Sequence, residues 1–229
     1  MAKILTTAIV ADIRNKLNGS VFSKNRYGGY VRTKVTPVNP QTTAQQNARN
    51  RLSANSQAWR GLTEDQRQAW IAAAANFPFT DIFGNAKILS GQALYVKLNT
   101  NASLVGGTPI SDPPLPQALS AIESLTVTAA DGTPAVSIAY SIPTATLNEK
   151  LAIFVTPMIT PGRNFVKNEF RFLTSIAATA TSPFNALSDY TALFGAPVAD
   201  QKLFVRALII NSITGQAGTP LQAQTIVAV

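Results

Sequence analysis

The sequence predicts an α+β protein in which a basic N-terminal arm, a β-hairpin and a small helical segment precede an antiparallel β-sandwich. Three observations support this fold class: positive charge gathered at the N-terminus, helix-capping patterns in the middle, and alternating apolar residues in the second half. A Pro-rich stretch, SDPPLPQ, divides the last two parts and is typical of a stiff linker. We therefore predict an assembly domain at residues 1–110, a linker at 111–119 and a β-sandwich domain at 120–229.

The charge is distributed unevenly along the chain. The first sixty residues contain ten Lys/Arg and a single acid, Asp12, a net of +9, whereas the whole chain carries +8. From residue 111 to the end, six bases and seven acids give a net of −1. A basic block at one end indicates contact with an anionic partner or with a neighbouring subunit.

The composition excludes several kinds of chemistry. The chain contains no cysteine and no histidine, so disulfides, thiolate nucleophiles and Ser-His-Asp catalysis are excluded within it. We expect a protein that is not an enzyme and that holds no cofactor and no metal. No apolar run reaches the length of a membrane-spanning helix, so we expect no membrane partner.

The N-terminal region predicts a hairpin. Residues 18–36, NGSVFSKNRYGGYVRTKVT, alternate in character on both sides of a Gly-rich turn at residues 26–29. One face of this hairpin would carry Tyr30, Arg32 and Lys34. The preceding segment, residues 1–16, predicts an ordinary strand or a short helix rather than a signal peptide, since Asp12 and Arg14 interrupt its apolar stretch.

Capping patterns then predict three helices. Pro37 and Pro40 end the hairpin strand, and Thr43 with Gln46 would open a helix over residues 44–60. A second capping box begins at Thr63 and predicts a helix over residues 64–75. A third helix would begin near residues 90–92 and end at Gly106-Gly107, with an apolar stripe of Leu94, Tyr95, Leu98 and Ala102.

Three side chains are expected to hold the first two helices together: Trp59, Leu62 and Trp70. A ligand platform built on the two tryptophans is the alternative interpretation. Glu64 and Asp65 are adjacent acids that could begin a metal site, but their place in the first turn of a helix explains them without a metal, and the sequence offers no third ligand.

Beyond the linker, the apolar period changes to two. Alternation at residues 125–127, 136–140, 153–155, 170–172 and 204–210 predicts six or seven short strands, separated by turns at Asp131-Gly132, Pro161-Gly162 and Thr214-Gly215. Residues 189–194 would form a short helix or a loop. We expect Arg206, on one of these strands, to pair with an acid such as Asp200 or Glu169.

The basic arm is the strongest candidate interaction site. Bases interleaved with aromatic residues can bind nucleic acid by phosphate contact and base stacking, here through residues 14–34. Docking on a neighbouring subunit and a plain solvated surface are the other interpretations. The candidate contact residues for assembly or for an anionic partner are Arg14, Lys16, Lys24, Arg26, Tyr27, Tyr30, Arg32, Lys34, Arg49 and Arg51.

Residues 18–105 contain an RYGGYVR turn, a PVNP segment, a Gln/Arg-rich helix and the pattern WRGLTEDQRQAW. In these motifs the N-terminal half resembles a group of small uncharacterised phage-encoded proteins. The second half resembles a fibronectin type III or immunoglobulin-like module. The resemblance implies a virion structural protein of the capsid, connector or tail, made in the bacterial host cytoplasm, with copies of itself and other virion proteins as partners. It transfers no catalytic residue.

Two other functions stay open at this point. The basic arm would also suit a DNA-binding or DNA-packaging accessory protein. A host- or carbohydrate-binding module on the sandwich would need exposed aromatic residues, and we expect most aromatic residues there to belong to the core.

Overall fold

A computed structural model describes residues 2–4, 13–36, 38–81 and 83–229. The expectations for residues 5–12 and for Pro37 lie outside the described residues. Within the described ranges the protein combines α-helices with antiparallel sheets, which confirms the α+β class. The domain boundaries at residues 110 and 119 stay a prediction.

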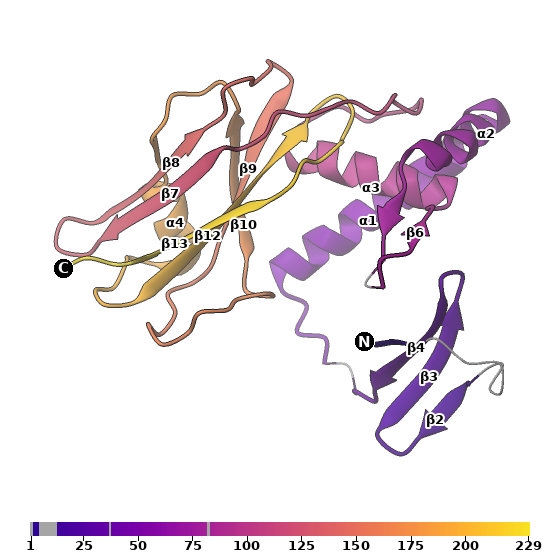
Figure 1. The fold of residues 1–229 in the computed structure, drawn as a ribbon, viewed down its shortest axis with the longest axis horizontal. Helices are drawn as coiled ribbons and strands as arrows, with labels where there is room; N and C mark the ends of the chain where they lie inside the picture. Colours follow the sequence, from indigo (N-terminus) through magenta and orange to yellow (C-terminus); the bar gives the residue numbers. More distant parts are fainter. Residues whose placement is uncertain (1, 5–12, 37, 82) are drawn as a thin grey trace.

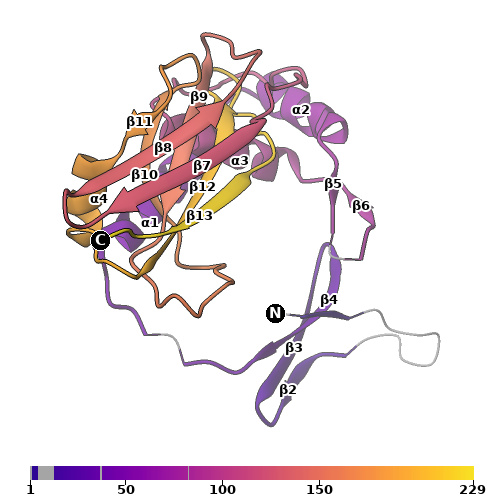
Figure 2. The ribbon, with the colours of Figure 1, turned by 60° about the vertical axis from the view of Figure 1, so that its left-hand side comes forward.

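An N-terminal sheet surrounds the predicted hairpin. Its strand order is β1-β4-β3-β2, so the hairpin β3–β4 gains a further short strand on each side. Both views show this sheet set apart from the rest of the molecule, beside the small hairpin β5–β6 (Figure 1, Figure 2). The strands are β1 (Ala2–Ile4), β2 (Asn15–Leu17), β3 (Ser20–Asn25), β4 (Gly28–Thr33), β5 (Phe79–Thr80) and β6 (Ala86–Lys87).

The helical segment follows, with α1 (Thr43–Gly61), α2 (Glu64–Ala73) and α3 (Gly91–Leu104). The second capping box is confirmed, because the Thr63 side chain accepts from the Gln66 N–H and the Gln66 side chain accepts from the Thr63 N–H. The first was wrong by one residue. Thr42, not Thr43, is the N-cap of α1 and accepts from the Gln45 N–H, because Thr43 already has its backbone in the helix.

Trp59, Leu62 and Trp70 belong to one apolar cluster, as predicted, but α1 and α2 pack mainly on α3 rather than on each other. Trp70 is fully buried there, and Tyr95 of α3 lies between the two indoles, with ring centroids 5.4 Å from Trp59 and 5.3 Å from Trp70. The stripe predicted for α3 is likewise buried. The two tryptophans therefore pack in an apolar cluster between helices and do not form a ligand platform.

The C-terminal half contains two antiparallel sheets with the orders β10-β9-β12-β13 and β11-β8-β7. Side chains from both sheets and from α4 share the largest buried cluster. A parallel bridge between Ala130 and Ala228 joins the sheet edges next to β7 and β13. The elements are β7 (Ser124–Ala130), β8 (Ala135–Ser141), β9 (Glu149–Val155), β10 (Arg171–Ala177), β11 (Phe184–Asn185), α4 (Leu187–Phe194), β12 (Lys202–Asn211) and β13 (Leu221–Ile226).

The expected pairing of Arg206 with an acid was wrong. Its guanidinium lies over the rings of Phe154 and Phe170, 5.4 and 4.5 Å from their centroids, while Glu169 pairs with Arg163. Arg206 lies on the face of β12 turned away from the other sheet, where Phe204 also packs. Aromatic faces replace a carboxylate there, because Arg can be stabilised by stacking.

Candidate assembly interface

The tip of the β3–β4 hairpin is built by local chemistry. Asn25 pairs with Gly28 across a turn formed by Arg26 and Tyr27, and the Asn25 side chain accepts from the Tyr27 N–H at 2.9 Å. Gly28 has φ of +113°, a conformation that disfavours any residue with a Cβ. The turn is therefore shorter than predicted, and Gly28 and Gly29 already belong to β4.

The strand register places bases on one face of the N-terminal sheet. Lys3 pairs with Tyr30, while Val21 pairs with both Arg32 and Lys16. Directly paired residues share a face, so Lys3, Lys16, Tyr30 and Arg32 lie together. We call this the basic face, and its grouping of Tyr30 with Arg32 agrees with the predicted alternation.

The opposite face carries apolar residues in the same way. Phe22 pairs with Val31, and Ile4 pairs with Gly29. Phe22, Val31 and Ile4 are half-buried, whereas Leu17, at the edge of this face, is 70% exposed. We call this the apolar face. A sheet with an incompletely covered apolar face lacks a second layer of its own.

The ten predicted contact residues are thus not all brought together. Three of them lie on the basic face and two at the hairpin tip, while Lys24 belongs to the register of the apolar face. Lys34 follows β4, and its N–H donates to the Gly19 carbonyl. The full set lies as follows: Lys16, Tyr30 and Arg32 on the basic face, Arg26 and Tyr27 at the tip, Lys24 opposite, Arg14 and Lys34 beside strands, and Arg49 and Arg51 on α1.

Few of these cations are neutralised inside the described part of the chain. Arg49 donates to the Asn39 side chain at 2.8 Å, which leaves its charge uncompensated. Lys16, Lys24, Arg26, Arg32 and Lys34 are exposed and, among the described residues, none has a carboxylate within ion-pair distance. This end of the protein therefore presents a positive potential to its surroundings.

Sequence reasoning missed the residues that hold the sheet against the rest of the protein. The Lys3 ammonium lies 3.3 Å from the Asp81 carboxylate, and the Tyr27 ring meets Phe79 edge-on with centroids 5.7 Å apart. These contacts join the N-terminal sheet to the β5–β6 hairpin. No local sequence pattern predicts these two contacts, since each joins residues that are far apart in the sequence.

Fully buried residues are absent from the described chain before Trp70. No described residue before Trp70 is buried, and α1 has no buried residue along its 19-residue length. Val35 and Val38, in the segment between β4 and α1, are 68% and 88% exposed. Because apolar burial drives folding, this region gains little stability from its own chain.

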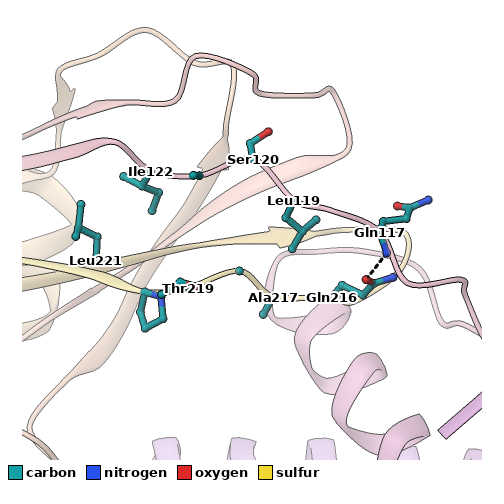
Figure 3. A pocket seen from close by; sticks show the side chains of 11 residues that line it. Gln117, Leu119, Ser120, Ile122, Gln216, Ala217, Thr219 and Leu221 are labelled. Atoms are coloured by element: carbon teal, nitrogen blue, oxygen red, sulfur yellow. Dashed lines mark hydrogen bonds between the residues drawn. The ribbon is translucent and has the colours of Figure 1, made fainter. Parts of the chain in front are cut away.

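The C-terminal half offers a second candidate site, a cavity of about 300 Å³ (Figure 3). Its walls are two extended segments, residues 117–122 and 216–221, which precede β7 and β13. Gln216 ties the segments together, because its side chain accepts from the Gln117 N–H at 2.9 Å and donates to the Leu115 carbonyl at 2.7 Å. The lining contains no titratable side chain, so it offers no acid or base to a ligand.

A buried carboxylate lies next to this cavity. Glu149, 3% exposed, accepts from the Ser120 N–H at 3.0 Å, the Ser120 hydroxyl at 2.6 Å and the Thr146 N–H at 3.0 Å. Burial raises the pKa of Glu149, but the hydrogen bonds from Ser120 and Thr146 outweigh it and hold the pKa below its ordinary value. The carboxylate therefore fastens the segment before β7 to the start of β9.

Replacing Glu149 with glutamine should lower the free energy of unfolding by about 1–3 kcal/mol at pH 7, because an amide cannot accept from all these donors. A lowered folded-state pKa stabilises the protein above the unfolded pKa of about 4.3, and this contribution is lost as the pH falls through the folded value. Urea unfolding at pH 7 and pH 3 should show the difference shrinking in acid. Glu123→Gln, at an exposed carboxyl, is the control, and an equal effect of both variants would contradict the prediction.

The adjacent acids Glu64 and Asp65 lie in the first turn of α2, as predicted. Glu64 accepts from Arg67 at 3.2 Å and from Gln68 at 2.7 Å. Across the described ranges, no three His, Cys, Asp or Glu side chains are grouped so as to hold a metal ion.

In the part of the chain that the structure describes, no helix is both long and apolar enough to cross a membrane. Comparison with known protein families found no model that matches the chain, and comparison with curated proteins found no matching relative.

Proposed function

We propose that this protein is a non-enzymatic structural component of a bacteriophage virion, in the capsid, connector or tail, that assembles with its own copies and with other virion proteins through the N-terminal sheet. The observation that carries the proposal is the absence of any buried described residue before Trp70. Four strands that contribute no buried residue need a partner to cover their apolar face. The phage origin rests on the sequence resemblance.

The C-terminal half fits this role as a rigid module. We propose that its two sheets form a β-sandwich of the fibronectin type III or immunoglobulin-like kind. In support, seven strands divide into antiparallel sheets of three and four, with their shared apolar cluster between them. Fold alone does not assign a function, so the assembly role rests on the N-terminal region.

DNA binding is the second candidate, and the unneutralised bases beside Tyr30 favour it. Stacking on bases also needs accessible aromatic rings, however, and part of the Tyr27 ring already contacts Phe79. Half-buried Tyr30 is then the remaining aromatic residue of the predicted set. Contact with a protein partner therefore explains more of the region than contact with nucleic acid.

Deleting residues 1–36 should abolish assembly and leave the rest of the protein folded, because the deletion removes no described buried residue. Light scattering would measure the assembled mass, thermal unfolding would check the remaining fold, and mass spectrometry of purified virions would show whether the full chain is present. A full-length protein that stays a compact monomer and is missing from virions would overturn the proposal. A deletion variant that still assembles but no longer retains DNA would favour the second candidate.

A further inference from the structure

The N-terminal sheet is attached to its own chain by a small contact surface. Lys3–Asp81 and Tyr27–Phe79 join it to the segment that carries the β5–β6 hairpin. None of its strands contributes to a buried apolar cluster of the described chain. The sheet can therefore leave this position without exposing a core.

The surface that receives the sheet is formed without it. Asp81 Oδ1 accepts from the N–H groups of Phe83 and Asn85 at 2.8 and 3.0 Å, which fixes the carboxylate inside the β5–β6 turn. Oδ2 is left to face Lys3. Burial raises the pKa of Asp81, but the hydrogen bonds from Phe83 and Asn85 and the Lys3 ammonium outweigh it and hold the pKa below its ordinary value. Every copy of the chain thus presents the same preformed acceptor.

The connection between the sheet and the helices allows a long reach. Residues 34–42 join β4 to α1, and those described are exposed. Nine residues of extended chain span about 30 Å. That length is comparable with the diameter of a small domain, so the sheet of one copy can reach a neighbour.

We propose that the N-terminal sheet is exchanged between copies, so that Lys3 and Tyr27 of one chain contact Asp81 and Phe79 of a second copy. Exchange keeps every contact, since donor and acceptor are identical in all copies, and it is a low-cost route to association. The inference rests on the proposed assembly role, because exchange requires neighbouring copies.

Cross-linking tests the exchange directly, because the natural chain has no cysteine. The double variant Tyr27→Cys/Phe79→Cys leaves the Lys3–Asp81 ion pair in place. A short bismaleimide applied to the assembled protein should link it into covalent dimers or longer ladders on denaturing gels. Predominantly internally linked monomers would overturn the proposal. Arg32→Cys/Phe79→Cys is the matched control for random collision, since Arg32 lies at the end of the hairpin away from the tip.

A mixed sample identifies the linked positions. Tyr27→Cys and Phe79→Cys chains carrying different tags are assembled together, cross-linked and digested, and the link between positions 27 and 79 is sought by mass spectrometry. Exchange predicts this link between the two tagged chains and a loss of yield on adding Asp81→Asn, which keeps an oxygen acceptor but removes the charge. Absence of the link in assembled protein overturns exchange. The virion measurement is independent of this result, so the two proposals can fail separately.

Discussion

Replacing Trp70 with alanine should lower the free energy of unfolding by about 3–5 kcal/mol, as for other fully buried aromatic residues. Trp70 is 0% exposed and meets Tyr95 edge-on at the centre of the helical cluster. Its indole N–H also donates to the Ser111 carbonyl at 2.8 Å. The substitution therefore removes the packing of three helices and one attachment of the Pro-rich segment.

Urea unfolding followed by circular dichroism would measure this loss. Trp59→Ala is the matched control, because Trp59 contacts the same Tyr95 ring but is only half-buried. Trp59→Ala should lower the free energy of unfolding clearly less than Trp70→Ala does, because the Trp59 side chain buries less apolar area. Equal losses for both variants would contradict the central place given to Trp70.

Features set by neighbouring residues were predictable from the sequence. The Thr63 capping box, the stripe of α3 and the alternation in β7 and β8 each follow from side chains within a few positions, and the structure confirms them. For residues 1–16 the sequence left a strand and a short helix open, and it did not locate the three-residue strands β1 and β2, because so short a segment has no period of its own. Pairing with the hairpin edges determines them.

Features that depend on distant segments were not predictable in this way. Arg206 was expected to pair with a carboxylate, but the loop after β9 places the Phe170 ring against its guanidinium group. The Lys3–Asp81 ion pair likewise depends on where two separate hairpins meet. In the candidate interface, sequence reasoning located the basic residues but not the side chains that position them.

The two halves of the protein meet through backbone as well as side chains. The Asn101 side chain of α3 donates to the Gly215 carbonyl, in the turn after β12, at 2.9 Å. Buried Asn99 binds the backbone N–H and C=O of Ile110, so the start of the Pro-rich segment is fastened to α3. The segment was predicted as a stiff linker, and these bonds to its flanks restrain it further. An exchanged N-terminal sheet would therefore change its position relative to a helical segment and a C-terminal half that are bonded to each other.

Gly215→Ala should disrupt this junction and lower the free energy of unfolding by about 2–5 kcal/mol, from the left-handed backbone and the steric clash together. Gly215 has φ of +66°, and a Cβ there would lie 2.0 Å from the Leu98 carbonyl oxygen of α3. Gly106→Ala separates the two causes, since Gly106 has φ of +75° but no atom within 4 Å of the added carbon. Urea unfolding of both variants should show a clearly larger loss at Gly215. A loss no greater than that of Gly106→Ala would mean that α3 and the turn after β12 do not depend on this close approach.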